Sequence, residues 1–546
     1  MEFKKANILV VIPARGGSKG IPRKNLRSMA GNPLIWYSIK TALASAYNPV
    51  VCVSTDDDEL ATISEKTGAL VIKRENKLGT DEVTLDPVIY DVYQKLTSAG
   101  QVFDLVVTIQ PTSPLLKTST LDAAIKHLFD NNGIDTLISA CNDTHLTWSE
   151  KEGEYYPNYE KRLNRQYLKQ VFKETGSFLI TRAQCVIPTS RIGKKVGLYL
   201  LSGSEAIDID NYEDWSICEF YLRRKKILFV VTGNKEVGLG HAYNVLSIAN
   251  EIMNHELVFL TDLSSQMAFE KIKDHNYSVF MQKSANIIDD IKDIGPHIVI
   301  NDILDTQSQY ISGLKSLGFK VINFEDLGPG AEMADIVINA MYPERVELNG
   351  HYFGHKYFCL KNEFYLTKIK KIVPQVKRVL ITFGGVDPNN YTFKVLKAIH
   401  EFCMNHHIEI DVIAGFGYNK YDTISGFSQI NIHQNIGNIS DYMLNADLVF
   451  TSAGRTAFEL AAVGVPSMVL CQNERELTHF FAGNEYGFMN FGMGTSVSEK
   501  IILDEFIKLC HDHKARVAMH EKMVSQGIRE GKARVLELIQ QLIRQS

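Results

Sequence analysis

The sequence predicts an α/β protein, and three observations lead to this prediction. Short apolar runs rich in β-branched residues recur along the chain, as in ILVVI at 8–12 and VVCVS at 50–54. Stretches with helical periodicity, such as LDAAIKHLFDNNG, separate these runs. The runs are apolar at successive positions, which is typical of parallel strands that are covered by helices on both faces.

Composition limits the class of protein further. The 546 residues, 45% of them hydrophobic, suffice for two to four globular domains with cores of their own. Eight scattered cysteines without a CxxC pair or a zinc-like Cys/His cluster indicate a reducing compartment. No signal peptide and no apolar run of about 20 residues is present, so we expect a soluble cytoplasmic protein that does not enter a membrane. The formal net charge of -5 argues against a nucleic-acid-binding surface.

A first series of alternating strands and helices is predicted before CEFYLRRKKILFVVTGN, where the same alternation begins again. These strands are 8–12, 50–54, 69–73, 104–110, 136–140 and 177–181. At the restart an amphipathic helix ends in a Lys/Arg run and a new strand begins at Ile227, so the first domain is predicted to span 1–224.

Two further βα series follow the restart. The first contains LVFLTD, HIVIND, KVINFED and DIVINA, and after a VPQ break at 373–375 the second contains RVLITFGG, IDVIAG, INIHQ, DLVFTSAG and SMVLCQ. We expect a pair of Rossmann-like lobes, 225–372 and 373–546, with a cleft between them. The tail from Asp504 to Ser546 is predicted to be helical.

The stretch ILVVIPARGGSKGIPRKN joins the first strand to a glycine-rich loop with four cations. The loop contains Gly16, Gly17 and Gly20, and its cations are Arg15, Lys19, Arg23 and Lys24. A turn of this kind after a strand presents backbone N–H groups that favour a polyphosphate. The alternative is that the cations only keep an exposed turn soluble. The spacing fits neither a Walker A loop nor GxGxxG.

At these residues the chain resembles the acylneuraminate cytidylyltransferases, the CMP-sialic acid synthetases. The matching segments are IPARGGSKGIPRKN with GNPLIWYSI, VSTDDDELATISEKTGALVIKR, LGTDEVTLDPVI, QPTSPL, LNRQYLKQVFKETGSFLITR and EAIDIDNYEDW, which together cover nearly all of the first 220 residues. The resemblance implies transfer of CMP from CTP to the anomeric hydroxyl of a nonulosonate, with release of pyrophosphate. It also implies a homodimer.

The resemblance further implies roles for individual residues on the nucleotide side. The triphosphate would be held by Arg15, Lys19 and Lys24, with Lys24 at the α-phosphate, while Ala14 and Asn25 would lie against the cytosine. Nucleotide- and sugar-proximal positions are Arg74, Asp81 and Thr84. For Arg74 and Asp81 a surface ion pair is an alternative explanation.

A divalent ion is expected at Asp208 and Asp210. These residues alternate along an extended IDID segment and so project to one face, where they could share one Mg²⁺, or Mn²⁺, that bridges the phosphate oxygens. The alternative is an acidic N-cap for the helix that begins near NYEDW.

The sugar side is expected just past a strand end, at Gln110, Thr112 and Ser113, and at Arg165, whose planar fork matches the sugar carboxylate. Two departures from the family fall on this side. Thr175-Gly176-Ser177 stands where the family usually has Asn-Gly-Ala, and Tyr167 stands where an acidic residue is frequent. The identity of the acid therefore stays open, with a KDO-type octulosonate as the alternative.

The second half opens with VTGNKEVGLGHAYNVLSIANEI, a strand, a glycine turn and a helix with His241 at its start. It resembles the UDP-sugar hydrolase of the pseudaminic acid pathway, a two-lobed glycosyltransferase-B-like enzyme with a GLGH motif. Further matches are KYFCLKNEF, ITFGGVDPNN and TSAGRTAFELAAVGVPS. The resemblance implies that His241, after Gly240, is the base for water attack on C1 of the sugar. The helix dipole disfavours a charged imidazole there, although a purely structural histidine is the alternative.

In the last lobe, Ser452, Ala453 and Gly454 open a helix whose free N–H groups would take a diphosphate, and Glu459 would accept from ribose hydroxyls. Asn244 replaces the arginine that the family has three residues after the histidine, Arg455 replaces the second glycine of its SAGG turn, and its NQ pair is not evident in CQNERELTH. Three alternatives remain for this half: a UDP-sugar hydrolase, a glycosyltransferase, or a nucleotide-sugar-binding and assembly module without turnover.

Overall fold

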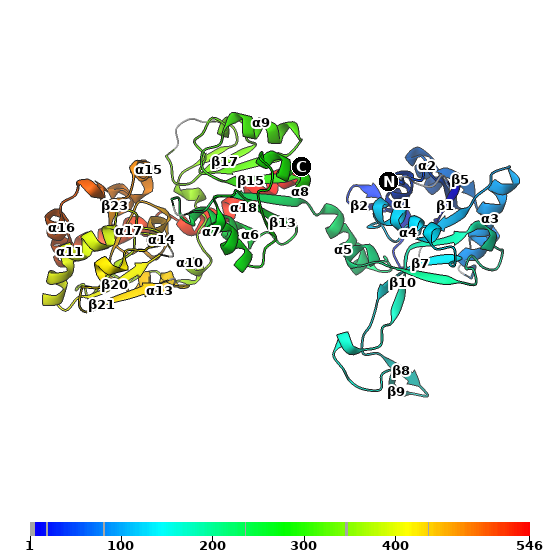
Figure 1. Cartoon of the computed structure of the whole chain (residues 1–546), viewed down its shortest axis with the longest axis horizontal. Coiled ribbons are helices and arrows are strands. Elements are labelled where there is room, and N and C mark those ends of the chain that lie inside the picture. Colours follow the sequence, from blue (N-terminus) through cyan, green and yellow to red (C-terminus); the bar gives the residue numbers. More distant parts are fainter. Residues whose placement is uncertain are drawn as a thin grey trace. The chain divides into compact units, whose positions relative to one another are not determined.

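The computed structural model describes residues 6–17, 20–79, 82–234, 236–343, 348–415, 417–434 and 436–546. The chain divides into two compact units, Met1–Arg224 and Lys225–Ser546 (Figure 1). Each unit is built of sheets covered by helices, which confirms the predicted α/β class.

The first unit is organised around a seven-stranded sheet with the order β11-β7-β10-β6-β1-β4-β5. Its strands are β1 (Ile8–Pro13), β4 (Val50–Thr55), β5 (Leu70–Lys73), β6 (Leu105–Thr108), β7 (Thr136–Asn142), β10 (Phe172–Arg182) and β11 (Val196–Leu200), and a small ribbon adds β2 (Ser28–Met29) and β3 (Asn32–Pro33). The helices are α1 (Leu34–Leu43), α2 (Asp58–Thr67), α3 (Leu85–Ser98), α4 (Thr118–Asp130) and α5 (Tyr212–Arg223). All six strands that the sequence predicts here are present.

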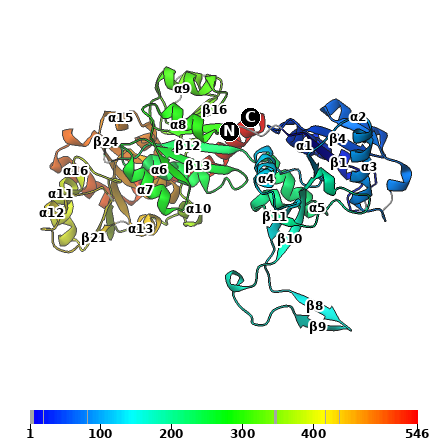
Figure 2. The same ribbon diagram turned by 45° about the vertical axis from the view of Figure 1, so that its right-hand side comes forward.

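One strand runs in a direction that the sequence analysis did not predict. β10 pairs antiparallel with both β6 and β7, whereas the buried apolar runs had indicated parallel strands throughout. β7 and β10 are joined by an arm without a helical crossover, and a parallel pair requires such a crossover. The arm carries the hairpin β8 (Trp148–Lys151) and β9 (Glu154–Pro157), which extends from the body of this unit (Figures 1 and 2).

The second unit begins with a lobe built on a parallel seven-stranded sheet, in the order β14-β13-β12-β15-β16-β17-β18. Its strands are β12 (Lys226–Val231), β13 (Glu256–Thr261), β14 (Val279–Met281), β15 (Ile298–Asp302), β16 (Lys320–Phe324), β17 (Ile336–Asn339) and β18 (His351–Phe353). Its helices are α6 (Gly240–Ala249), α7 (Gln266–Asp274), α8 (Ile287–Ile294) and α9 (Ser308–Ser316).

The other lobe has a parallel six-stranded sheet in the order β21-β20-β19-β22-β23-β24. Its strands are β19 (Arg378–Ile381), β20 (Glu409–Ala414), β21 (Ile430–Gln434), β22 (Leu448–Thr451), β23 (Ser467–Cys471) and β24 (Phe488–Met493). The helices of this part of the chain are α10 (Glu363–Leu366), α11 (Tyr391–Asn405), α12 (Tyr421–Ile424), α13 (Ile439–Asn445), α14 (Arg455–Val463), α15 (Glu474–Leu477), α16 (Glu499–His511), α17 (His513–Val524) and α18 (Gly531–Gln545).

The last helix returns to the first lobe of this unit. Four side chains of α18 are buried in the same core as β12 and β15: Val535, Ile539, Leu542 and Ile543. The segment 373–546 that the sequence indicated as one lobe therefore ends in a helix that packs elsewhere. No helix in the described ranges has the length and apolar character that crossing a bilayer requires.

Candidate functional site

The loop after β1 is fastened to the acidic turn between β4 and α2. The Gly16 N–H donates to Asp56 Oδ1 at 3.0 Å, and a Cβ at Gly16 would lie 2.6 Å from Asp57 Oδ2. Arg23 forms ion pairs of 2.5 Å with both Asp57 and Glu59. Part of the positive charge that the sequence places on this loop thus holds the loop in position. Gly17 is exposed, with no atom within 4 Å of a Cβ built there.

Lys24 points from this loop toward the segment 208–210. Its Nζ donates to the Ile209 carbonyl oxygen at 2.6 Å. Burial lowers the pKa of Lys24 from its ordinary value, and the nearby charges of Asp210 and Asp208 oppose that shift. The loop approaches the same segment through Gly20, where a Cβ would lie 2.6 Å from the Asp210 carbonyl oxygen. One cation of the loop and the two carboxylates therefore share one region of the unit.

The surroundings of Asp208 leave its carboxylate open to a ligand. Its Oδ1 is buried without a hydrogen-bond partner in the described structure, and a Cβ on Gly176 would lie 2.9 Å from that atom. A buried carboxylate oxygen without a partner is costly unless something binds it. Hard oxygen ligands of this kind suit Mg²⁺, which commonly takes only one or two carboxylates beside phosphate and water. The described residues contain no cluster of three or more acidic, His or Cys side chains in a metal-binding arrangement, so any ion here would need such additional ligands.

The alternative role of the two aspartates as helix caps is wrong. The N-cap of α5 is Asn211, whose side chain accepts from the Asp214 N–H, and Asp214 completes the capping box. Asp210 contributes to this cap only its backbone N–H, which donates to Asp214 Oδ2 at 3.0 Å, and the side chains of the capping box are those of Asn211 and Asp214.

The predicted sugar-side residues after β6 lie beside the same segment. The Ile209 N–H donates to the Thr112 carbonyl at 2.9 Å, and the Gln110 N–H donates to the Gly176 carbonyl at 3.3 Å. The hydroxyl oxygens of Thr112 and Ser113 are buried without partners in the described structure. Together with Asp208 Oδ1 they form a group of polar atoms without protein partners near the end of β6.

Arg74 is not the surface residue that the alternative explanation required. Only 8% of its surface is exposed, and its Nη2 donates to the Ser54 carbonyl at 2.9 Å. Burial lowers the pKa of Arg74, the charge of Asp56 opposes the shift and that of Arg15 adds to it, which places Arg74 near the glycine loop. Ala14 is bound to the same strand end, because its N–H donates to the Ser54 carbonyl at 3.0 Å.

Two further predicted residues of the nucleotide side are described, and two are not. Asn25 holds the loop itself, since its Nδ2 donates to the Arg15 carbonyl at 3.1 Å. Thr84 is exposed at the N-cap of α3 and makes no capping hydrogen bond. Lys19 and Asp81 lie outside the described residues.

Arg165 belongs to the arm, and the structure does not bring it to Lys24 within this chain. Its side chain is exposed and, among the described residues, makes no hydrogen bond to the Lys24 region. It lines a cavity of about 350 Å³ together with Asn142, Thr144, Gln166, Leu168 and Gln170.

In the second unit, His241 is paired with a buried carboxylate. His241 is the second residue of α6, after Gly240, and its Nδ1 lies 2.5 Å from Oδ1 of Asp302 at the end of β15. The Asp302 side chain is 1% exposed and the His241 side chain 14%. Because a carboxylate only accepts, the contact places a proton on Nδ1, so that in the neutral imidazole Nε2 is the acceptor. The other carboxylate oxygen of Asp302 accepts from Asn244 Nδ2 at 2.8 Å.

The expected diphosphate turn of the last lobe is occupied by the chain itself. The Glu476 carboxylate accepts from the Ala453 N–H at 3.3 Å and from the Gln472 N–H at 2.8 Å. Burial raises the pKa of Glu476. The expectation of unpaired N–H groups from Ser452 to Gly454 is therefore wrong at Ala453. Glu459 is likewise engaged, in a 3.1 Å ion pair with Lys361.

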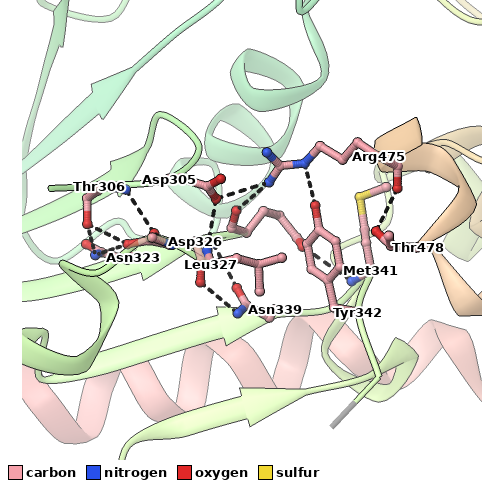
Figure 3. Close-up of polar contacts among 12 residues, drawn as sticks. Asp305, Thr306, Asn323, Asp326, Leu327, Asn339, Met341, Tyr342, Arg475 and Thr478 are labelled. Carbon is pink, nitrogen blue, oxygen red and sulfur yellow. Dashed lines mark hydrogen bonds and ion pairs between the residues drawn. The ribbon is translucent and has the colours of Figure 1, made fainter. Parts of the chain in front are cut away.

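A buried polar network fixes the turn after β16 (Figure 3). Asp326 accepts from the Thr306 hydroxyl at 2.7 Å and from Asn323 Nδ2 at 2.6 Å. Arg475 comes from the other lobe and donates to the Tyr342 hydroxyl at 2.5 Å and to the Glu325 carbonyl at 3.1 Å. The two lobes of this unit are thus joined by an arginine beside the turn.

Several residues of these sites are absent from the sequence-based set, among them Asp302, Glu325, Lys361 and Glu476. Asp302 and Glu325 directly end or follow the strands read from HIVIND and KVINFED, and carboxylates at strand ends are the signal that identifies candidates in parallel sheets. Lys361 and Glu476 carry no such signal, because Glu459 and Ala453, which they contact, are distant from them in the chain.

Comparison with known proteins supports the family that the sequence predicts for the first unit. The cytidylyltransferase family matches residues 9–194. The CMP-N,N'-diacetyllegionaminic acid synthase of Legionella pneumophila is 33% identical over 39% of this chain and 94% of its own length. An uncharacterized protein of Methanocaldococcus jannaschii is 33% identical over 46% of this chain, which spans only 56% of that relative. A crystal structure of MurG from Acinetobacter baumannii is similar over 58% of this chain and 99% of its own, with a TM-score of 0.44 and 14% identity. Through its first unit, the chain belongs to the cytidylyltransferase family.

Proposed function

We propose that the first unit transfers CMP from CTP to the anomeric hydroxyl of a nonulosonate. The observation that carries the proposal is that Lys24 lies close to Asp208 and Asp210, although nearly the whole sequence of the unit separates them. The 33% identity to a legionaminic acid synthase supports a nine-carbon acid as the acceptor.

The chemistry follows from the residues at this site. The C2 hydroxyl oxygen forms a bond to the α-phosphorus, the bond to the β-phosphate oxygen breaks, the hydroxyl proton is lost, and pyrophosphate carries away the electron pair. Lys24 would neutralise charge on the α-phosphate in the transition state. Asp208 and Asp210 would hold Mg²⁺ or Mn²⁺, which supplies further neutralisation and acidifies the attacking hydroxyl.

Pyrophosphate release from CTP tests this function directly, with a panel of legionaminic, pseudaminic, neuraminic and octulosonic acids. We expect turnover with a nine-carbon acid and a loss of about 10²-fold or more in Lys24→Met, since a charged donor to the reacting phosphate is removed. Lys40→Met is the matched control, because Lys40 is an exposed cation of the same unit. Turnover of octulosonate alone would remove the nonulosonate assignment, and a fully active Lys24→Met would remove the site.

We propose further that this unit acts as a homodimer joined through the arm. Every residue of β8 and β9 is exposed, and a two-stranded hairpin without a buried face is marginally stable alone. The arm exposes large apolar side chains, among them Trp148 at 54% and Tyr155 at 69%. Association would bury this apolar surface.

For the second unit we propose hydrolysis of a nucleotide sugar, with His241 as the base. The contact with buried Asp302 supports this role, because it leaves Nε2 free to take a proton from water. Asp302 acts as a positioning residue that fixes the tautomer and orientation of the imidazole.

Release of UDP from UDP-sugars, compared between the wild type and His241→Ala, distinguishes the alternatives. We expect a loss of about 10²- to 10⁴-fold, the range for a general base. Release that appears only when an acceptor sugar is added would identify a glycosyltransferase. Equal and negligible release in both proteins would indicate a binding and assembly module.

A further inference from the structure

Arg455 belongs to one lobe of the second unit, while its guanidinium lies in the His241 site of the other. It is the first residue of α14, and its Nη2 donates to Asn244 Oδ1 at 3.1 Å and to the Cys359 carbonyl at 3.0 Å. The guanidinium carbon stacks 4.4 Å from the centre of the Phe358 ring. Gly240 makes room for this side chain, because a Cβ there would lie 3.2 Å from Arg455 Cδ.

A continuous chain of hydrogen bonds connects this guanidinium to the imidazole. Asn244 accepts from Arg455 through Oδ1 and donates to Asp302 through Nδ2, so both ends of its amide are fixed. Asp302 in turn holds His241. Asn244 is 3% exposed, which gives the chain little freedom to rearrange. The positions of guanidinium and imidazole are therefore coupled across the two lobes.

The remaining donors of Arg455 are available to a ligand. Its hydrogen bonds to described residues use Nη2 alone, so the N–H groups at Nε and Nη1 have no acceptor among those residues. The nearby carboxyl group of Glu325 accepts instead from the backbone N–H groups of Ala340 and Met341. Arg455 is a half-buried cation without a carboxylate bonded to it, and such a guanidinium favours an anion. The Glu476 carboxylate takes the Ala453 N–H at the same helix start, so the guanidinium and not the backbone is the group that is open to an anion.

Two buried polar atoms flank the same helix start and have no partner in the described structure. They are Thr451 Oγ1 and His479 Nε2, and His479 also contacts the turn through Nδ1, 2.7 Å from the Ala453 carbonyl. His479 is only 9% exposed. Buried polar atoms without partners are a second indication that a polar ligand binds at this helix start. Thr451 Oγ1 can donate to a ligand oxygen, whereas His479 Nε2 is an acceptor, because Nδ1 faces the Ala453 carbonyl, and it therefore suits a hydroxyl group of the ligand.

We propose that Arg455 binds the departing diphosphate of the nucleotide sugar at the His241 site, from the lobe opposite the base. The proposal rests on hydrolysis by this unit. Water oxygen bonds to C1 as His241 Nε2 takes its proton, the bond from C1 to the diphosphate oxygen breaks, and Arg455 neutralises the negative charge on that oxygen. Arg455 and Asn244 thus meet across a single hydrogen bond, one from α14 and the other from α6.

Calorimetric binding of UDP to the full chain tests the role of Arg455. We expect Arg455→Met to weaken UDP binding about 10- to 100-fold, the worth of a charged hydrogen bond, and Arg455→Lys to weaken it less. Arg544→Met, which removes an exposed arginine, should bind UDP as the wild type does. Lys24→Met should bind UDP as the wild type does. A loss of UDP affinity in this variant would instead mean that UDP binds at the first unit.

A transposed variant tests whether a guanidinium at this contact is what binds UDP. Asn244→Arg in the Arg455→Gly background returns a guanidinium to the same contact from the other side, and we expect it to recover at least tenfold of the affinity that Arg455→Gly loses. Thermal unfolding of each variant separates lost binding from lost folding. Wild-type affinity in a folded Arg455→Met, or no UDP binding by the wild type, overturns the proposal.

The two proposals fail separately in these experiments. A wild type that binds UDP through Arg455 but releases none from UDP-sugars contradicts hydrolysis and leaves the Arg455 site standing. Equal rates of UDP-sugar hydrolysis in the wild type and in a folded Arg455→Met contradict only the role of Arg455.

Discussion

Glu325 is a buried acidic residue of the second unit whose ionisation depends on the fold. It is 6% exposed, and burial raises the pKa of its carboxyl to about 7, with the charge of Arg455 opposing the shift. Its backbone has a φ of 51°, a left-handed value that is uncommon outside glycine. Strained residues of this kind occur at functional sites, and Glu325 adjoins the His241 network.

The raised pKa makes the stability of this unit depend on pH. Since the folded state binds the proton more tightly than the unfolded state, the stabilisation is complete below about pH 4.5 and is lost as the pH rises through 7. The loss is on the order of 3 kcal/mol. We expect the urea concentration at the unfolding midpoint of this unit to decrease as the pH is raised from 5 to 8 in the wild type. The decrease should be smaller in Glu325→Gln. Glu332→Gln, an exposed neighbour, is the control, and parallel profiles of wild type and Glu325→Gln would contradict the assignment.

Single residues also show where prediction from sequence ends. Lys24, Asp208 and Asp210 were identified because a resemblance links segments that are far apart in the chain, and the structure places them together. The pairs Glu459 with Lys361 and Ala453 with Glu476 were not identified. Such pairs are set by how helices and loops pack, which no local pattern in the sequence encodes.

At the scale of elements, strands were more predictable than their directions. Apolar runs identified the central strands of all three sheets, because burial on both faces leaves a continuous pattern. β10 has the same pattern as its parallel neighbours although it runs antiparallel, since burial does not depend on direction. The edge strands β11, β14, β18 and β24 were missed, because edge positions leave most of their side chains partly exposed.

The arm is the element whose role is easiest to test. We expect Tyr155→Ser with Tyr167→Ser to shift the first unit's association toward monomer in sedimentation velocity of the full chain, because both side chains are more than two-thirds exposed apolar surface. Lys161→Ser, an exposed polar change on the same arm, should leave association unchanged. An unchanged dimer in the double variant, or a wild type that is monomeric at all concentrations, would contradict the proposal.

At the scale of the whole molecule, the chain consists of two compact units. In the second unit the last helix, α18, packs back onto the first lobe of that unit. α18 follows the other lobe in sequence but buries Val535, Ile539 and Leu542 in the core of the first. Lys532 adds an ion pair of 2.9 Å from α18 to Glu251. A helix that crosses back in this way limits how far the lobes of one unit can separate, while the first unit has no share in that core.

This arrangement predicts that damage to α18 stays within the second unit. We expect Ile539→Ala to destabilise that unit by about 2–5 kcal/mol, because a fully buried side chain leaves a cavity between α18 and the first-lobe sheet. Gln540→Ala, one residue along on the exposed face, should be close to neutral. Amide exchange should rise in β12 and β15 of Ile539→Ala before it rises in β19 and β22, and cytidylyl transfer should be unchanged. Equal exchange in both lobes would mean that the two sheets unfold as one, and a loss of transfer would mean that the two units depend on each other for stability.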